Sequence, residues 1–125
     1  MAYDSNNIFA RILRGEIPCD KVHEDEHTLA FRDINPQAPV HILVIPKGAY
    51  VSFNDFAAKA TEAEIAALVR AVGKVAEMAG VAEDGWRLLS NVGANGHQEV
   101  PHLHIHIFGG RQLGAMIGKA VIPAA

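Results

Sequence analysis

The stretch "VPHLHIHIF", Val100 to Phe108, alternates histidines with aliphatic residues and gives the first indication of the fold. Three of the chain's seven histidines stand here at every second position, as His102, His104 and His106. Successive side chains of a β-strand point to opposite faces of the sheet. The alternation therefore predicts a strand with three imidazoles in a row on one face and an aliphatic face that packs against the core.

The rest of the sequence predicts a sheet for that strand to join. Short runs at residues 21–25 and 28–33 flank a charged corner and indicate a pair of antiparallel strands. The run VHILVIP, residues 40–46, is almost continuously apolar and indicates a strand that is buried on both faces. A fourth strand is expected in WRLLSN, residues 86–91, ahead of the histidine-rich strand.

Two helices are expected to cover the sheet. Near the N-terminus, NNIFARILRGEIP has apolar residues at the spacing of one helical face and is ended by glycine and proline. A longer helix is predicted from Thr61 to Ala79, where Thr61 and Glu64 form a capping box and Gly80 ends the helix. This order of elements predicts one α+β domain, residues 1–125, with a mainly antiparallel five-stranded sheet and two helices.

Composition narrows the classes of partner. The 125 residues have a formal net charge of −3 and no cluster of Lys or Arg, so we expect neither nucleic acid nor an anionic membrane as a partner. The single cysteine, Cys19, cannot form an internal disulfide, and no signal-peptide pattern or membrane-spanning apolar run is visible. The expected location is therefore the cytoplasm. No second motif accompanies Cys19, which we expect to be a structural thiol rather than a nucleophile.

Three interpretations of the aligned histidines remain open from their spacing alone. The first is a solvent-exposed polar face that happens to be rich in histidine. The second is a zinc site, because His-x-His on a strand is a common ligand pair and a third imidazole completes an open site. The third is nucleophilic catalysis, in which a neutral imidazole attacks an electrophile while its neighbours handle protons and charge. A fourth histidine, His41, opens an expected strand and could converge on the row.

The loop before the histidines is rich in glycine. In VGANGH, residues 92–97, Gly93 and Gly96 would allow backbone N–H groups to approach a phosphate. The same glycines equally fit a tight connection between two strands. No cysteine pair or HExxH-type helix accompanies the histidines, so the context favours phosphate chemistry without excluding a metal.

These motifs resemble the histidine triad family. HLHIHIF resembles the family's His-x-His-x-His-x-x signature, and NIFARILRGEIP, LAFRDINPQAPVHILVIPK and SNVGANGHQEVPHLHIHIFGGRQ resemble consecutive blocks of its Hint branch, from Asn7 to Gln112. The GGRQ after the histidines favours this branch over the dinucleoside polyphosphate hydrolases. The resemblance implies a homodimer whose two sheets join into one larger sheet. It also implies hydrolysis of purine nucleoside 5'-phosphoramidates, such as adenosine 5'-monophosphoramidate, to the nucleoside monophosphate and an amine, with no metal or other cofactor.

By position in the motif, the resemblance implies distinct roles for four histidines. His104 is the nucleophile that becomes nucleotidylated, and the backbone carbonyl of His102 accepts a hydrogen bond from its other ring nitrogen. His106 contacts the α-phosphate, and His41 completes the cluster. A P–N bond cleaves readily when its nitrogen leaves as a protonated amine, so an acid must reach that nitrogen while histidine attacks phosphorus.

The resemblance also implies a nucleotide pocket. Asp33 and Ile34 match the family's ribose-binding pair. Further nucleotide contacts are expected at Asn91, His97, Gln98 and Glu99, together with His104 and His106. The purine base is expected to lie against Ile8, Phe9, Ile12 and Phe31, although these four apolar side chains are by residue type typical of an ordinary core.

Two positions depart from the family pattern. Better-known Hint proteins have Gly and Ser where this chain has His97 and Glu99. An ionised Glu99 would repel the phosphate unless it turns away, is protonated or faces a cationic leaving group. Two other functions remain as alternatives: a zinc-binding or metallo-hydrolase domain, and a nucleotide-binding scaffold without catalysis.

Overall fold

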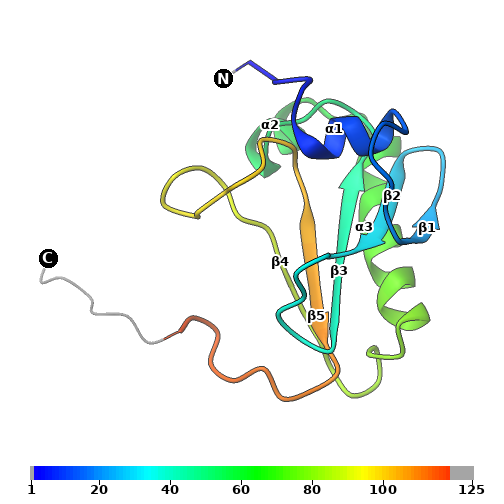
Figure 1. The fold of residues 1–125 in the computed structure, drawn as a ribbon, viewed down its shortest axis with the longest axis vertical. Helices are drawn as coiled ribbons and strands as arrows, with labels where there is room; N and C mark the ends of the chain where they lie inside the picture. The colour runs from blue at the N-terminus through cyan, green and yellow to red at the C-terminus, as the bar shows by residue number, and fades with distance from the viewer. Residues whose placement is uncertain (1, 119–125) are drawn as a thin grey trace, which may run out of the picture.

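The sheet has five strands in the order β1-β2-β3-β5-β4, and every neighbouring pair is antiparallel (Figure 1). The computed structural model describes residues 2–118. The strands are β1 Lys21–Glu24, β2 Thr28–Arg32, β3 Val40–Pro46, β4 Arg87–Leu89 and β5 Ile105–Gly109. The helices are α1 Ile8–Leu13, α2 Phe53–Lys59 and α3 Glu62–Met78. The predicted α+β fold is confirmed, with one helix more than the two expected.

Each helix begins at a polar residue whose side chain accepts a backbone N–H of the first turn. Asn7 caps α1, and Thr61 and Glu64 form the predicted capping box of α3. The unpredicted helix, α2, has a capping box of its own, made by Ser52 and Asp55. Seven residues are too few for a clear apolar period, so this capping box was the only sequence signal for α2.

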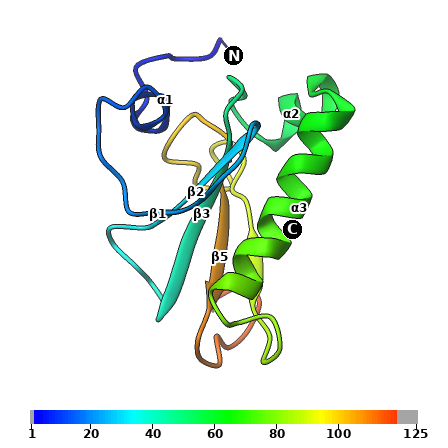
Figure 2. The same ribbon diagram turned by 90° about the vertical axis from the view of Figure 1, so that its right-hand side faces the viewer.

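The two faces of the sheet carry separate apolar clusters. Figure 2 shows α3 along one face of the sheet and α1 on the other. On the α3 face, the aliphatic residues between the histidines pack against the helix, as predicted: Leu103, Ile105 and Ile107 share a buried cluster with Leu68, Val72 and Val75. On the α1 face, a smaller cluster holds Phe9, Leu29, Phe31, Leu43 and Ile45. Burial of both faces explains the apolar run of β3.

The histidine-rich strand is shorter than predicted. Strand β5 begins at Ile105, so His102 and His104 lie in the segment before it. The ladder with β3 ends where Ile105 pairs with Val44. Beyond that point the carbonyl of Pro46 accepts a hydrogen bond from the His102 ring instead of from a strand backbone. Only His106 therefore stands on a regular strand, but the three imidazoles lie on the face opposite the aliphatic residues, as predicted, with His102 fully buried.

The outer edge of β4 has no strand partner within residues 2–118, because β4 is the last strand of the sheet. Leu88, at the middle of β4, is 55% exposed. Across the same described residues, no helix combines the length and apolar character needed to cross a membrane.

Candidate active site

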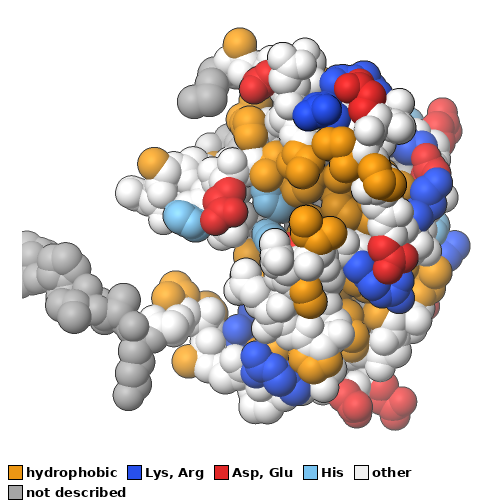
Figure 3. All heavy atoms as spheres, viewed as in Figure 1, with side chains coloured by type: hydrophobic (Ala, Val, Ile, Leu, Met, Phe, Trp, Pro, Cys, Tyr) orange, Lys and Arg blue, Asp and Glu red, His pale blue; other side chains and the backbone are white. Residues whose placement is uncertain are grey.

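A cavity of about 510 Å³ lies on the α1 side of the sheet, with an apolar end and a polar end. Helix α1 and strand β2 contribute to the apolar end, which is lined by Ile8, Phe9, Ile12, Ile17, Phe31, Leu43 and Val100. The polar end is lined by Asp33, Asn91, His97, Glu99, His104 and His106. Figure 3 shows histidine side chains at the centre of this face, beside a continuous apolar area. The cavity therefore combines a surface for a flat apolar group with a cluster of imidazoles.

His104 presents an unprotonated ring nitrogen. Its Nδ1 lies 2.7 Å from the carbonyl oxygen of His102. Because a carbonyl oxygen only accepts, Nδ1 must carry the proton, and in the neutral ring Nε2 keeps its lone pair. Burial lowers the pKa of His104, which keeps the ring neutral at pH 7. The Phe9 ring packs edge-on against this imidazole, with centroids 4.9 Å apart.

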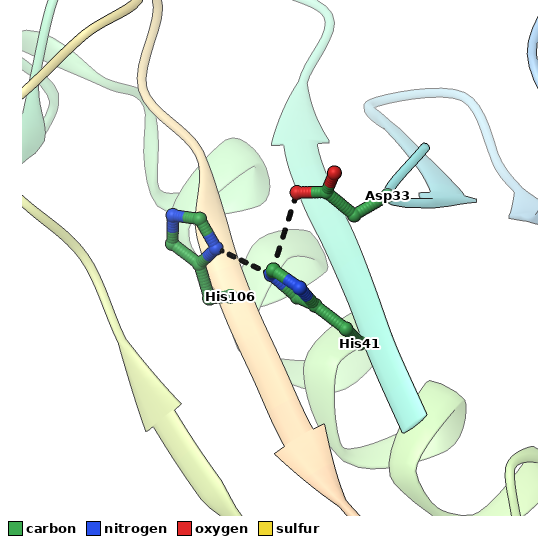
Figure 4. A group of neighbouring side chains, drawn as sticks. All are labelled: Asp33, His41 and His106. Atoms are coloured by element: carbon green, nitrogen blue, oxygen red, sulfur yellow. Dashed lines mark hydrogen bonds and ion pairs between the residues drawn. The ribbon is translucent and has the colours of Figure 1, made fainter. Parts of the chain in front are cut away.

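His106 has the opposite arrangement because of a hydrogen-bond chain behind it. The backbone N–H of Gln37 donates to His41 Nδ1 over 3.1 Å, which leaves the proton of the neutral His41 ring on Nε2. His41 Nε2 then donates to His106 Nδ1 over 2.8 Å (Figure 4). His106 therefore carries its own proton on Nε2. Burial, and then repulsion from His104 and His41, lower the pKa of His106 to about 4.

Asp33 lies beside this chain and completes a possible set of metal donors. Its Oδ2 is 3.4 Å from His41 Nε2, and its Oδ1 accepts the backbone N–H of Asn35. Donor atoms of Asp33, His41 and His106 lie within 4.8 Å of one another. A metal at His41 Nε2 would force the imidazole proton onto Nδ1, against the N–H of Gln37. The donor set therefore fits a hydrogen-bonded relay and does not fit a metal ion.

His102 is fully buried and does not line the cavity. Its Nε2 donates to the Pro46 carbonyl over 2.9 Å, and its Nδ1 lies 2.6 Å from the hydroxyl of Tyr3. Both ring nitrogens are thus used inside the protein. Of the four predicted catalytic histidines, His104 and His106 line the cavity, whereas His41 and His102 support them from behind.

All but one of the predicted nucleotide contacts line the cavity. The exception is Gln98, whose side-chain amide closes the glycine-rich loop from inside. It accepts the N–H of Gly93 and donates to the carbonyls of Val51 and Val100. Gln98 therefore supports the loop and does not line the cavity. The Gly93 N–H, which was considered as a phosphate ligand, is occupied by the Gln98 side chain. Gly96 packs too closely on the Val92 backbone to carry a Cβ. Both observations fit a tight connection between two strands.

The two unusual residues, His97 and Glu99, pair with each other at the rim of the cavity. His97 Nε2 lies 3.0 Å from Glu99 Oε1, and both side chains are largely exposed. His97 adopts a left-handed backbone conformation, with φ of 56°, which is uncommon for a residue other than glycine. This pairing is none of the three outcomes considered for Glu99, since an imidazole of the same loop engages the carboxylate.

Three contributors to the site were not anticipated in these roles. Tyr3 bonds His102, and Ser90 Oγ donates to the carbonyl of His104 over 2.8 Å. Neither has a local sequence signal, because both partners are distant along the chain. Cys19 lines the cavity near its apolar end. Burial raises the pKa of its thiol.

Comparisons with known proteins show the family of the chain. The family model described as HIT domain matches residues 14–113. An uncharacterised 13.2 kDa HIT-like protein from Azospirillum brasilense is 73% identical over 117 residues, covering 94% of this chain and 96% of that protein. A purine nucleoside phosphoramidase from Escherichia coli is 47% identical over 110 residues (88% and 92% covered), and a 14 kDa zinc-binding protein from Zea mays is 46% identical over 110 residues (88% and 86%).

A solved structure gives the same assignment. The 0.95 Å structure of a histidine triad protein from Clostridium difficile superposes with a TM-score of 0.81 and 39% identity, covering 93% of this chain and 100% of that one. The chain therefore belongs to the HIT domain family, the family of histidine triad proteins.

Proposed function

We propose that this protein is a HIT family hydrolase that cleaves purine nucleoside 5'-phosphoramidates through a nucleotidyl intermediate on His104. The observation that carries the proposal is the hydrogen bond from His104 Nδ1 to the His102 carbonyl. It leaves a neutral nucleophile with its lone pair on Nε2, in a ring that lines the cavity. The 47% identity to a purine nucleoside phosphoramidase supports the same substrate class.

The different tautomers of His104 and His106 suit the two rings to different steps of the reaction. Nε2 of His104 attacks the α-phosphorus and the P–N bond breaks. The anionic phosphate raises the pKa of His106 on binding, so His106 takes up a second proton at Nδ1, which replaces the hydrogen bond accepted from His41, and gives the Nε2 proton to the departing nitrogen. Water then attacks the nucleotidyl-histidine, and His106 takes the proton from water. The products are an amine, a nucleoside monophosphate and free His104.

The cavity offers a matching surface for the rest of the substrate. The purine would lie at the apolar end, between α1 and Phe31, with the ribose hydroxyls at Asp33 and Ile34. Phe9 joins the two ends, since its ring contacts both Phe31 and His104. This arrangement supports an AMP-like ligand, and none of the steps requires a cofactor.

The proposal includes a homodimer in the cytoplasm, with residues 1–125 as one domain. The free edge of β4 and the exposed Leu88 supply a surface on which two sheets can join. The net charge of −3 supports a small-molecule substrate rather than nucleic acid or a membrane surface.

The decisive experiment is hydrolysis of adenosine 5'-phosphoramidates, with the covalent adenylate trapped by acid quench and located by mass spectrometry. We expect turnover and an adduct on His104. Binding of AMP without turnover of any phosphoramidate would replace the proposal with a nucleotide-binding scaffold. Stoichiometric zinc in the purified protein, with activity that a chelator abolishes, would replace it with a metallo-hydrolase.

A further inference from the structure

The N-terminal segment ahead of α1 reaches the most deeply buried histidine of the site. The Tyr3 hydroxyl lies 2.6 Å from His102 Nδ1, and the two rings meet edge-on with centroids 5.6 Å apart. Tyr3 lies outside residues 14–113, the part of the chain that matches the family model. We infer that Tyr3 is a positioning residue of this active site, which holds His102 and, through it, the nucleophile His104; this rests on the proposed function.

The direction of the Tyr3 hydrogen bond follows from the other side of the ring. His102 Nε2 lies 2.9 Å from the Pro46 carbonyl oxygen, which only accepts, so Nε2 carries the proton. Burial lowers the pKa of His102, and the ring is therefore neutral, with a lone pair on Nδ1. The Tyr3 hydroxyl must donate to that lone pair. The imidazole is thus held at both nitrogens, between a donor and an acceptor.

The fixed ring sets the position of the atom that His104 needs. The carbonyl oxygen that accepts the His104 Nδ1–H belongs to His102 itself. Without the Tyr3 hydroxyl the buried Nδ1 would be unpaired, and a shift of His102 that relieves this would displace its carbonyl and disturb the bond that keeps the His104 lone pair on Nε2. Because His102 is fully buried, water cannot replace the Tyr3 hydroxyl without a change in packing.

The segment that carries Tyr3 is anchored to α1 by polar contacts. The Asp4 carbonyl accepts both the backbone N–H and the side-chain amide of Asn7, the residue that caps α1. The Ser5 carbonyl accepts a hydrogen bond from Arg14 at the other end of the helix. These contacts hold the segment beside the helix that lines the cavity. Tyr3 itself does not line the cavity, so its loss should affect turnover rather than substrate binding.

The test compares Tyr3→Phe with Tyr50→Phe, since these are the two tyrosines of the chain. Both variants remove one hydroxyl that takes part in a hydrogen bond. The Tyr50 hydroxyl donates to Glu64, on α3, and is the matched control. For Tyr3→Phe we expect kcat to fall about fivefold or more, the change that one neutral hydrogen bond of ~1 kcal/mol represents, with KM within about twofold. Tyr50→Phe should leave both constants unchanged.

Nitrogen-15 NMR of the histidine rings provides a readout that needs no substrate. In the parent protein, His102 should be protonated on Nε2, with an Nδ1 signal typical of a hydrogen-bonded acceptor. In Tyr3→Phe, that Nδ1 signal should move toward the position of a free acceptor, and the His104 signals should show a mixture of tautomers. Tyr50→Phe should retain the parent spectrum.

The NMR results separate this inference from the proposed function. If His102 in the parent protein is protonated on Nδ1, or if Tyr3→Phe leaves the His102 and His104 signals unchanged, the inference is overturned whether or not the protein hydrolyses phosphoramidates. The parent spectrum alone decides the first point, even where the variant does not fold. If the signals move as expected but the parent protein turns over no phosphoramidate, the positioning contact stands and only the proposed function fails.

Discussion

Mild acid should destabilise this protein through its buried histidines, and His106 allows the size of the effect to be worked out. The ordinary pKa of a histidine side chain is 6.5, and that of His106 in the folded protein is about 4. Between these two values the unfolded chain binds a proton that the folded protein excludes. The free energy of unfolding must therefore fall as the pH falls below 6.5, and it is independent of this group at higher pH.

The magnitude follows from the two pKa values. Between pH 7 and about pH 4.5, the shift of His106 corresponds to about 2.5 kcal/mol of unfolding free energy if it is fully expressed. The ring is only partly buried, so solvent screening reduces this to roughly 1.5 kcal/mol. The carboxylates with lowered pKa, such as Glu24 at about 2 and Asp55, lose their contributions mainly at lower pH. Between pH 7 and pH 4.5, the change in unfolding free energy therefore comes chiefly from histidines.

Urea unfolding of the parent protein and of His106→Gln, followed by circular dichroism at several pH values, measures this effect. We expect the parent protein to lose more stability than the variant over the window, by roughly 1.5 kcal/mol. The variant should still lose some stability as the pH falls, because burial also lowers the pKa of His41, His102 and His104. Equal losses in the two proteins would refute the assignment of a strongly lowered pKa to His106.

Three further predictions concern the chemistry and the assembly. His104→Ala should reduce phosphoramidate turnover roughly ten-thousandfold while AMP binding by calorimetry stays within a few fold, and near-normal turnover would remove His104 as the nucleophile. If Glu99 attracts a cationic leaving group, Glu99→Gln should weaken selection for amine-bearing over neutral leaving groups by roughly 0.5 to 1.5 kcal/mol in kcat/KM, whereas equal selectivity would exclude Glu99 from leaving-group recognition. Sedimentation should give a dimer at micromolar concentration, and Leu88→Lys should shift it toward monomer; a monomeric parent protein would contradict the joined sheets.

The sequence predicts best the features that neighbouring residues determine together. The helix over 61–79 was identified because Thr61 and Glu64 cap it and its apolar side chains repeat over several turns. The α3-facing aliphatic residues of the histidine motif were likewise predictable from their alternation. The start of β5 at Ile105 was not predictable, because it depends on the Pro46 carbonyl accepting a hydrogen bond from the His102 ring.

The candidate site shows the same limit. Family resemblance identified most of the side chains that line the cavity, but it assigned Gln98 to the pocket. The bonds of Gln98 to Gly93 and Val51 depend on how the loop closes. Tyr3 lies 99 positions from His102 along the chain, so only the folded protein brings its hydroxyl to that ring. Single hydrogen bonds between distant residues leave no periodic pattern in a sequence.

Phe9 and Phe31 belong to two structures at once, since they form the buried cluster on the α1 face and also line the apolar end of the cavity. Their rings meet edge-on with centroids 5.6 Å apart. An evolving protein therefore cannot enlarge or reshape the apolar end of the cavity independently of its own folding. A smaller side chain at either position opens room in the cavity but costs about 3–5 kcal/mol of stability, the usual effect of truncating a buried phenylalanine to alanine. Changes in the shape of this cavity should accordingly appear together with compensating substitutions elsewhere in the α1-side cluster, or not at all.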